Sequence, residues 1–508
     1  MVHEVQRPHA MLAGELLADL SLPDGAWRHL PLSGLALDSR ALARGGLFLA
    51  CGGSRAHGLD YLDQALARGA ALVLAEPTES WSAARIAALA ESTPVPVLAV
   101  EDLSRRASGI AARFYGEPGR RLRLMGVTGT NGKTSVAWSL AHALPQEWAC
   151  AVTGTLGNGF PGALAPATHT TPDAVQAQRI LAELAAAGAR TLAMEVSSHA
   201  LDQHRLAALD FHTAVFTNLT RDHLDYHGTL HAYARAKRRL FEWPGLETAV
   251  LNADDDLGAG LAEELAGRVE RVVCHRRRAK PAGDRFIRLA GLESSDQGLR
   301  LALETSWGAA ELRTPLLGEF NATNLMLVLG VMLAWDIPLE TAVARLSRVP
   351  GVPGRMQRFG GGERPLVVVD YAHTPDALQR ALTSLRPHTR GRLWCLFGCG
   401  GERDRGKRPI MGQVAEALAD RVIVTDDNPR REPSATIIAD ILEGMNEPRR
   451  ALVLPDRAFA IATALVEAAP GDTVLIAGKG HETWQEVGDL RLPFSDVGQV
   501  ERWLEGDA

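Results

Sequence analysis

The stretch GVTGTNGKTS, residues 126–135, combines glycines, a lysine and hydroxyl residues at a spacing typical of a phosphate-binding loop. Glycines let backbone N–H groups approach phosphate oxygens, and the N-terminus of a following helix favours negative charge. Lys133 would reach the β- and γ-phosphates of a nucleotide, and the Thr134 hydroxyl would bind Mg²⁺. The stretch departs from the Walker A pattern because Val127 stands where a glycine is required, and the nearest glycine is Gly126. It therefore predicts a phosphate loop of an uncommon form.

Two further stretches carry residues that could bind metal. In AMEVSSHALDQHR, residues 193–205, Glu195 stands near the end of an apolar strand, where a carboxylate is costly unless it pairs or binds metal. The stretch FTNLTRDHLDYHGTLHAYARAKRRLF, residues 216–241, is predicted to be a helical segment. It carries three histidines, His223, His227 and His231, and a lysine, Lys237. These histidines with nearby aspartates could suggest zinc, but their spacing is no zinc signature, and a phosphate loop requires Mg²⁺ with oxygen ligands. Spacing alone leaves the three histidines unassigned.

The surrounding sequence predicts the elements that would position these side chains. LRLMGV before the loop reads as a strand and SVAWSLAHAL after it as a helix. The segments GLFLACGG, AALVLAE, RTLAMEV, FHTAVFTNL, PLVVVDY, RLWCLFG, RVIVTDD and DTVLIAG read as strands that alternate with helices, and GEFNATNLMLVLGVMLA reads as a helix. This alternation predicts parallel sheets built from βαβ units. A length of 508 residues suggests about three domains, and Gly/Pro-rich breaks at 114–123 and 347–359 place them at 1–117, 118–350 and 351–508.

Composition excludes several classes of protein. The net charge of −6, from 54 basic and 60 acidic residues, gives no reason to expect a nucleic-acid partner. The N-terminus lacks a signal pattern, and the most apolar run, residues 325–335, is shorter than the roughly 20 residues of a membrane span. The five cysteines are scattered, and the spacing of Cys395 and Cys399 suits neither a zinc site nor a CxxC redox site. We expect a cytoplasmic monomer.

Several motifs occur in order along the chain: GVTGTNGKTS, MEVSSHAL, TNLTRDHLDYHG with AKRRLF, GEFNATN, VPGRMQ, DYAHTPDAL, GCGGERDRGKRP, DDNPR and GKGHE. Together they closely resemble the Mur ligases of peptidoglycan synthesis, and best the members that add meso-diaminopimelate to UDP-N-acetylmuramoyl-L-alanyl-D-glutamate. Folylpolyglutamate synthases share this form of glycine loop. The resemblance implies an α/β fold of three domains, with a central P-loop ATPase-type domain of parallel or mixed sheet. An N-terminal nucleotide-sugar-binding α/β domain and a C-terminal Rossmann-like domain would flank it.

The resemblance also implies an activity and a set of roles around the nucleotide. ATP would phosphorylate the carboxylate of the UDP substrate, and an incoming amine would displace phosphate to leave an amide. Mg²⁺ would be held by Thr134, Glu195, His223 and Lys237, the lysine as a carbamate that supplies an anionic oxygen. The catalytic residues would be Lys133, Glu195, His223 and Lys237. The residues implied to contact ATP are Gly129, Thr130, Asn131, Gly132, Lys133, Thr134, Ser135, Asn321, Asn324, Arg355, Asp370, Tyr371 and His373.

The remaining positions match substrate contacts of the family. The UDP-substrate positions are Leu37, Ser39, Ser54, Arg55, Ala56, His169, Thr170, Thr171, Ser197, Gln203 and Arg205. His169 departs from close relatives, which have asparagine there, and this leaves its contact open. The diaminopimelate positions are Arg403, Asp427, Asn428, Pro429, Arg430, Gly478 and Glu482. Arginines can bind carboxylates through paired N–H bonds, and Asp427 and Glu482 can take the ammonium.

Rival interpretations remain at this point. A lysine-adding Mur ligase characteristically lacks the arginine at Arg430, and a folylpolyglutamate synthase would lack the DDNPR and LDSR segments. A small-molecule kinase would need no domain for a dicarboxylic amino acid. A nucleotide switch would carry an NKxD-type segment, which is not found at the usual position. An ATPase-coupled binding module would hydrolyse ATP without forming a covalent product.

Overall fold

The computed structural model describes residues 11–53, 56–276 and 285–506. These residues form two compact units, Met1–Val273 and Cys274–Ala508. The domain boundaries expected after residues 117 and 350 do not coincide with this division, and they stay predictions. No helix of the described part of the chain is long and apolar enough to cross a bilayer.

The first unit begins with a small parallel sheet in the order β3-β4-β5-β6. Its strands are β3 (Leu35–Ala36), β4 (Leu47–Ala50), β5 (Leu72–Ala75) and β6 (Val97–Ala99). Around them lie α1 (Ala13–Leu16), α2 (Leu62–Ala67), α3 (Ala83–Ser92), α4 (Leu103–Phe114) and the strand pair β1 (Met11–Leu12) and β2 (Pro31–Leu32). The strands β4 and β5 are buried along their whole length, as expected for parallel strands covered on both faces. The strands expected in GLFLACGG and AALVLAE are confirmed.

The glycine loop belongs to an 11-stranded sheet, and the strands that this unit contributes to it lie in the order β10-β9-β8-β11-β7-β12-β13-β14. The neighbouring pairs β8–β11, β11–β7, β7–β12 and β12–β13 are parallel, whereas β8–β9 and β9–β10 are antiparallel. The bounds are β7 (Arg123–Thr128), β8 (Cys150–Gly154), β9 (Gly157–Phe160), β10 (Ala163–Ala165), β11 (Thr191–Glu195), β12 (Phe211–Phe216), β13 (Thr248–Asn252) and β14 (Glu270–His275). The helices are α5 (Lys133–Ala143), α6 (Ala174–Ala186), α7 (Ser198–Asp202), α8 (Leu224–His227), α9 (Leu230–Arg238) and α10 (Asp256–Glu264).

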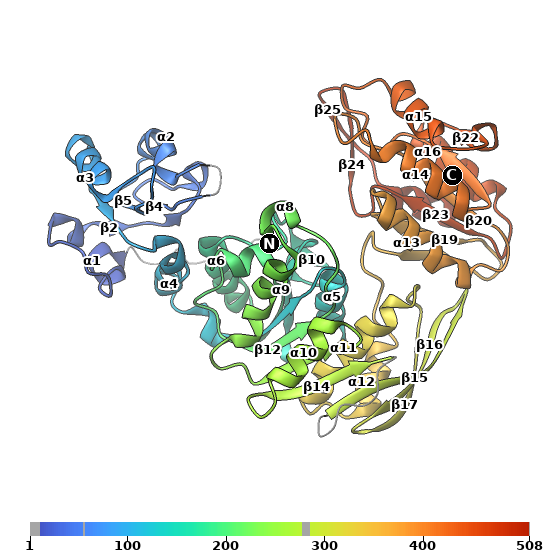
Figure 1. The fold of residues 1–508 in the computed structure, drawn as a ribbon, viewed down its shortest axis with the longest axis horizontal. Coiled ribbons are helices and arrows are strands. Elements are labelled where there is room, and N and C mark those ends of the chain that lie inside the picture. Colours follow the sequence, from blue (N-terminus) through green and yellow to red (C-terminus); the bar gives the residue numbers. More distant parts are fainter. Residues whose placement is uncertain (1–10, 54–55, 277–284, 507–508) are drawn as a thin grey trace. The chain divides into compact units, whose positions relative to one another are not determined.

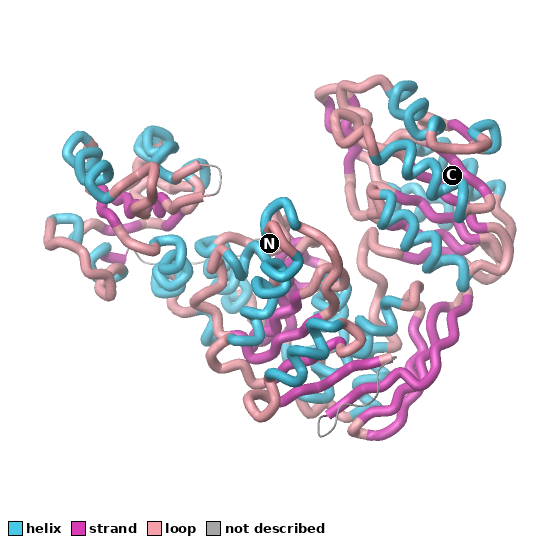
Figure 2. Tube along the Cα trace, in the orientation of Figure 1, coloured by secondary structure: helices cyan, strands magenta, loops and turns pink. Residues whose placement is uncertain are grey.

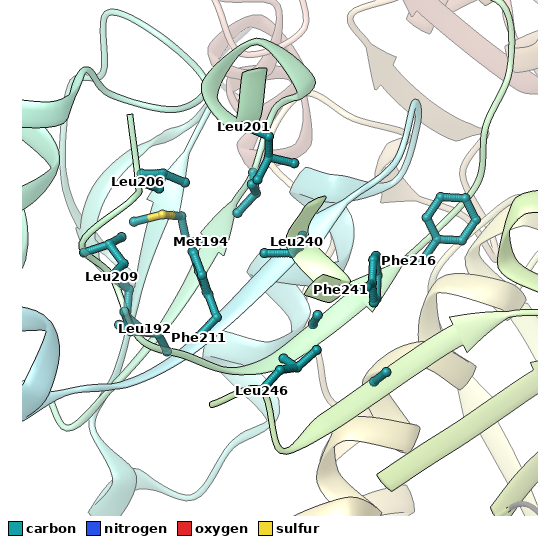
Figure 3. Packing of buried hydrophobic residues seen from close by; sticks show 14 of the residues in the cluster. Leu192, Met194, Leu201, Leu206, Leu209, Phe211, Phe216, Leu240, Phe241 and Leu246 are labelled. Carbon is teal, nitrogen blue, oxygen red and sulfur yellow. The ribbon is translucent and has the colours of Figure 1, made fainter. Parts of the chain in front are cut away.

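A buried hydrophobic cluster fixes the strands of this sheet in place. Leu192 and Met194 of β11 lie near Phe211 of β12, and Phe216 of β12 lies beside Phe241 in the same cluster (Figure 3). Burying each such side chain stabilises the fold by about 1.5–3 kcal/mol. The carboxyl ends of β7 and β11 therefore have a rigid support, and the glycine loop and Glu195 follow from these ends.

The second unit contains a six-stranded sheet in the order β18-β19-β23-β20-β21-β22. Its strands are β18 (Gln357–Gly360), β19 (Leu366–Asp370), β20 (Leu393–Phe397), β21 (Arg421–Val424), β22 (Leu452–Val453) and β23 (Thr473–Ala477). All pairs are parallel except β18 with β19. The helices of the sheet are α13 (Pro375–Leu385), α14 (Lys407–Leu418), α15 (Ser434–Glu443), α16 (Arg457–Glu467) and α17 (Asp496–Glu505), and a hairpin joins β24 (Trp484–Val487) to β25 (Leu490–Pro493).

Helices cover both faces of this sheet (Figure 2). Alternate residues of its strands belong to two different hydrophobic clusters. Leu475 and Phe397 pack with residues of α13, α14 and α15, whereas Ile476 and Leu396 pack with residues of α16 and α17. The expected Rossmann-like C-terminal sheet is thereby confirmed. The unit also contains α11 (Phe320–Ala334), the predicted GEFNATN helix, and α12 (Leu339–Leu346).

Two features differ from the sequence-based prediction. The strands β15 (Arg285–Ser295), β16 (Gly298–Thr305) and β17 (Gly308–Thr314) form an antiparallel meander that the expected βαβ alternation does not include (Figure 1). Gly298 and Gly308, both with positive φ, begin its second and third strands. The helical segment expected to carry the three histidines is interrupted at Gly228, which also has positive φ, and His223 precedes α8 rather than lying within a helix.

Candidate functional site

The glycine loop lies between β7 and α5, as the sequence predicts. Gly129 and Gly132 have φ values of 148° and 85°, which favour glycine over residues with side chains. A Cβ on Gly129 would also lie 1.9 Å from the Thr217 hydroxyl. Lys133 begins α5 and donates hydrogen bonds to the carbonyls of Gly129 and Thr130, both at 2.9 Å. The loop therefore presents a lysine and a helix N-terminus at the same end of the sheet.

Glu195 ends β11, and its carboxylate lies next to the start of α5. The Thr134 hydroxyl donates to Glu195 at 2.9 Å, and the backbone N–H of Thr155 donates at 2.8 Å. Glu195 is only 2% exposed, so its carboxylate depends on these partners. A hydroxyl and a carboxylate in contact form the oxygen-rich pair that Mg²⁺ prefers. The residues present fit a magnesium ion at this point.

Lys237 of α9 reaches the glycine loop from another element. Its Nζ donates to the Gly129 carbonyl at 2.7 Å and lies 4.4 Å from the centre of the Tyr233 ring. The side chain is almost fully buried. Burial, and then the nearby charge of Lys133, lower the pKa of Lys237 to about 6.

His223 lies in the same neighbourhood but is exposed. Its ring centre is 6.0 Å from that of Tyr233 and 5.0 Å from that of His199. His227 contacts the Ser198 hydroxyl at 2.9 Å, whereas His231 is exposed. Within the described ranges, no three His, Cys, Asp or Glu side chains group in a way that could hold a metal.

The residues expected at the muramoyl dipeptide converge on the same strand end. The Thr171 hydroxyl donates to the Glu195 carbonyl at 2.7 Å and accepts from the Ser197 N–H at 3.0 Å. Arg205 donates to the Thr171 carbonyl at 3.0 Å and to the Gln203 side chain. The backbone carbonyl of Glu195, the metal-binding candidate, therefore accepts a hydrogen bond from Thr171, one of the dipeptide-binding candidates.

Two other UDP-substrate candidates lie nearby on the segment before α6. The Thr170 hydroxyl is 3.2 Å from that of Thr155. His169 is exposed, contacts the Thr168 hydroxyl at 3.1 Å and lines a cavity of about 230 Å³ that also contains Arg179.

The N-terminal sheet carries the remaining UDP-substrate candidates. Leu37, Ser39 and Ala56 line one cavity of about 720 Å³. Ser54 and Arg55 lie outside the described residues. His57 lines the same cavity and contacts the Glu76 carbonyl at 2.8 Å; the sequence motif GGSRAHG contains it, but type and spacing gave no reason to select it.

The nucleotide-binding candidates of the second unit form two groups. Asn321 and Asn324 are buried at the start of α11 and hydrogen-bond to each other at 3.1 Å. Arg355 lies over the Tyr371 ring at 4.7 Å, and the His373 ring is 4.6 Å from that ring. A planar guanidinium on an aromatic ring is a surface on which an adenine or a phosphate can dock.

Asp370 ends β19, directly before Tyr371, and its carboxylate accepts from the Met356 N–H at 2.7 Å. Burial raises the pKa of Asp370.

The amino-acid candidates lie at the carboxyl ends of β20, β21 and β23, where open α/β sheets bind ligands. A Cβ on Gly400 would lie 3.0 Å from Arg430 Nη1 and 3.6 Å from Arg403 Cγ, so the two arginines flank this glycine. Gly478 similarly lies against Asp427, because a Cβ there would be 2.6 Å from Asp427 Oδ2. These four candidates therefore surround one group of strand ends.

Arg430 itself is held in a defined orientation. Its φ of 54° is uncommon for a residue with a side chain, and its backbone pairs with β24. The guanidinium donates to the Gly401 carbonyl at 2.9 Å and forms an ion pair with Glu486 at 2.9 Å, while the side chain is 21% exposed. Pro429 precedes it and fixes the turn.

Lys479 lies among the amino-acid candidates but was not selected from the sequence, although it belongs to the GKGHE motif. It is fully buried and donates to the Asn428 side chain at 3.0 Å and to Glu482 at 2.9 Å. Asn428 also donates to Glu482 at 3.0 Å. Lysine is seldom fully buried unless it is paired. The only sequence feature that could have indicated Lys479 was its place in this short motif.

Comparisons with known proteins identify the family of the chain. The description "Mur ligase family, catalytic domain" matches residues 31–115, "Mur ligase middle domain" matches 127–332 and "Mur ligase, glutamate ligase domain" matches 354–480. The chain belongs to the Mur ligase family. A family member from Alkalilimnicola ehrlichii named UDP-N-acetylmuramoyl-L-alanyl-D-glutamate--2,6-diaminopimelate ligase is 54% identical, with 92% of this chain and 93% of that protein covered.

Two further members of the Mur ligase family carry the same name. The one from Pseudomonas aeruginosa is 51% identical, and 94% of this chain and 96% of that protein are covered. A solved structure described as UDP-N-acetylmuramoyl-L-alanyl-D-glutamate--2,6-diaminopimelate ligase is 38% identical with a TM-score of 0.71, covering 98% of this chain and 99% of that one. The similarity therefore extends over all three Mur ligase domains.

Proposed function

We propose that this chain is an ATP-dependent ligase that joins meso-diaminopimelate to the glutamate carboxylate of UDP-N-acetylmuramoyl-L-alanyl-D-glutamate. Relatives with this name are 51% and 54% identical to it over more than nine-tenths of its length. The reaction belongs to the synthesis of peptidoglycan precursors, and its use of ATP is consistent with the cytoplasm.

The observation that carries the choice of amino acid is the group of charges at the carboxyl ends of β20 and β21. The side chains of Arg403 and Arg430 both lie close to Gly400, and each carries a guanidinium. Asp427 offers a buried carboxylate at the next strand end. Guanidiniums bind carboxylates and a carboxylate binds an ammonium, so the three groups complement an amino-acid head of the kind that diaminopimelate carries twice.

The phosphate side of the reaction follows from the glycine loop. Phosphoryl transfer needs reactants in line and charge neutralised, with little covalent help from the protein. The loop N–H groups and the Lys133 ammonium would stabilise negative charge on the γ-phosphoryl group as it moves to the substrate carboxylate. Arg205, which lies beside Thr171, would hold that substrate. The amine of diaminopimelate then attacks the acyl phosphate, phosphate leaves, and the amine loses a proton as the amide forms.

Mg²⁺ is proposed on the contacting pair of Thr134 and Glu195. When bound, it would supply positive charge that offsets the charge of the phosphates. Thr155 would keep the Glu195 carboxylate oriented, because the Thr155 N–H donates to the oxygen that Thr134 does not contact.

Lys237 is proposed to act as a carbamate with His223 in the same metal region. A neutral amine is the form that reacts with carbon dioxide, and a pKa of about 6 leaves Lys237 neutral at pH 7 and above. Lys237→Ala is then expected to be inactive, with partial recovery when small carboxylates are added to the solution. Full activity of this variant, or no carbamate signal after labelling with ¹³C-bicarbonate, would contradict the proposal.

The test of the proposed function is a mass-spectrometric assay with UDP-N-acetylmuramoyl-L-alanyl-D-glutamate, ATP and a panel of amino acids. The expected product carries one added diaminopimelate residue, and lysine is expected to give little or none. Product with lysine alone would identify a lysine-adding enzyme, and glutamate addition to a folate would identify a folylpolyglutamate synthase.

A further inference from the structure

A fully buried ion pair lies beneath the strand ends that carry the amino-acid candidates. Arg457 and Asp496 both have 0% side-chain exposure and are joined by two hydrogen bonds of 2.7 Å. They are the first residues of α16 and α17. A positive charge at a helix N-terminus is unfavourable, and a buried ion pair usually adds no more stability than apolar side chains of similar volume. Stability alone therefore gives no reason for an arginine at this position.

The other contacts of Arg457 point to the site. Its guanidinium donates to the Asp426 carbonyl at 3.2 Å and to the Ala477 carbonyl at 3.0 Å. These carbonyls come immediately before Asp427 and Gly478, on the segments that follow β21 and end β23. The Arg457 guanidinium thus connects the ends of β21 and β23, which are separated by β20 in the sheet.

The positive charge of the Arg457 guanidinium also acts on the Asp427 carboxylate. Among the described residues, none donates a hydrogen bond to the Asp427 carboxylate, although only 7% of the residue is exposed. Burial raises the pKa of Asp427; the positive charges of Arg457 and Lys479 oppose this rise, and the negative charges of Glu482 and Asp496 add to it. The titratable groups that face Asp427 from neighbouring elements are Arg457, Asp496, Lys479, Glu482, Tyr371 and Cys399.

We propose that Arg457, held by Asp496, is a positioning residue for the amino-acid substrate: it fixes the spacing of Asp427 and Gly478, so that the Asp427 carboxylate is in place to receive the substrate ammonium. The inference rests on the proposed function, because it places the diaminopimelate ammonium at Asp427. Arg457 itself does not touch the substrate.

The test uses Arg457→Met and Arg457→Lys in the full-length enzyme. Arg457→Met removes both the charge and the fork, so kcat/KM for diaminopimelate is expected to fall about 10²-fold, the size of effect that a displacement of about 1 Å produces. The acid limb of its pH profile is expected to move to higher pH, because Asp427 loses an opposite charge. Arg457→Lys keeps the charge but not the planar fork, so its KM for diaminopimelate rises while the acid limb stays in place.

A matched control is Asp472→Asn, which alters a buried carboxylate at the opposite end of β23. Asp472 accepts from the Trp394 indole at 3.0 Å and from the Arg392 N–H at 2.7 Å, far along the strand from Gly478. This variant is expected to lose thermal stability while KM for diaminopimelate and the pH profile stay unchanged. Asp496→Asn, which leaves Arg457 in place but loosens its clamp, is expected to raise KM for diaminopimelate and serves if Arg457→Met does not fold.

A second measurement separates this inference from the proposed function. Positional isotope exchange in ¹⁸O-labelled ATP, with the UDP substrate and without diaminopimelate, reports formation of the acyl phosphate alone. The Arg457 and Asp496 variants are expected to keep this exchange. An unchanged KM for diaminopimelate would overturn the positioning role. A slower exchange together with KM values raised equally for every substrate would also overturn it. Failure of the wild type to use diaminopimelate would instead overturn the proposed function.

Discussion

At the scale of single residues, burial and partners decide which chemistry a lysine can perform. Lys237 is nearly buried, and its pKa of about 6 reflects burial and the neighbouring charge of Lys133. Lys479 is equally buried but lies between an amide oxygen and a carboxylate, which match its positive charge. The first lysine is therefore suited to react as an amine, and the second to hold neighbouring side chains in place.

Lys237→Met is expected to raise the free energy of unfolding of the ligand-free protein in carbon-dioxide-free buffer, and the gain is expected to shrink between pH 7 and pH 10. The pKa of Lys237 is lowered from 10.5 to about 6 on folding, so between these values the unfolded chain binds more protons than the folded one. Stability of the wild type therefore rises with pH in this window, and the variant lacks this dependence. Urea unfolding across the range measures the difference. A gain that stays constant with pH would contradict the assigned pKa.

Lys133→Ala is expected to lower turnover by about 10²-fold or more while the UDP substrate still binds. The variant removes a positive charge from the loop that would face the γ-phosphate, and such groups act mainly in the transition state. Steady-state kinetics and calorimetric titration with the UDP substrate provide the two measurements. A loss smaller than about tenfold would remove Lys133 from this role.

Arg430→Ala is expected to lower kcat/KM for diaminopimelate by roughly a hundredfold, while the small activity with lysine stays flat or rises slightly. A carboxylate that loses its charged partner in a desolvated site costs about 2–4 kcal/mol, which corresponds to this factor. Arg430→Lys should recover only part of the activity, since an ammonium cannot form the paired contact.

The adjacent arginine provides the control for this prediction. Arg431 pairs with Asp489 and is 68% exposed, so Arg431→Ala is expected to keep both activities. Because Arg430 already pairs with Glu486, the side chain is oriented before the substrate arrives. Equal proportional losses for diaminopimelate and lysine in Arg430→Ala would mean that Arg430 serves folding or catalysis and does not read the substrate.

At the scale of elements, the close approach of β8 to β11 holds the Glu195 carboxylate. Gly154 ends β8 with an ordinary φ, yet a Cβ there would lie 2.1 Å from Glu195 Oε1. Gly154→Ala is therefore expected to displace the carboxylate from Thr134, to lower activity about tenfold or more and to raise the Mg²⁺ concentration needed for half-maximal rate. Overpacking is expected to cost about 1–3 kcal/mol of stability.

Gly260→Ala is the matched control, because this glycine of α10 has an ordinary φ and a Cβ there would extend into open space among the described residues. It should keep activity and Mg²⁺ dependence, and thermal unfolding of both variants separates stability from function. If Gly154→Ala behaved like Gly260→Ala in activity and metal dependence, the Glu195 position would not matter for the reaction.

Hydrophobic periodicity and turn residues predicted most of these elements, because buried parallel strands read as short apolar runs between glycines and helices. The strand before the glycine loop, the strand that ends at Glu195 and the four central strands of the C-terminal sheet are all present. The meander β15–β17 was missed because the sequence was expected to alternate strands with helices, whereas these three strands follow one another directly. The role of Arg457 was not predictable, since its contacts are with backbone carbonyls of segments distant in sequence.

At the scale of the whole molecule, the candidate groups divide between the two compact units. The glycine loop, Glu195, Lys237 and the UDP-substrate candidates belong to Met1–Val273, whereas the amino-acid candidates belong to Cys274–Ala508. Sequence motifs predicted the family and its three domains, because the motifs keep their order along the chain. The division into compact units depends on the density of tertiary contacts, which no single motif encodes.

The whole-reaction prediction is that ATP is converted to ADP and phosphate, in a ratio of one to each amide formed, and only when the UDP substrate and diaminopimelate are both present. A glycine loop with Lys133 presents the γ-phosphoryl group for transfer, which leaves ADP; an adenylating ligase would instead release AMP and pyrophosphate. Chromatography of nucleotides, with phosphate release and product mass followed in the same samples, measures the stoichiometry. AMP as the nucleotide product would exclude the acyl-phosphate route. Steady ADP release without an amine would indicate a kinase or an ATPase. A ligase keeps its acyl phosphate bound until the amine attacks, so it does not release ADP continuously when the amine is absent.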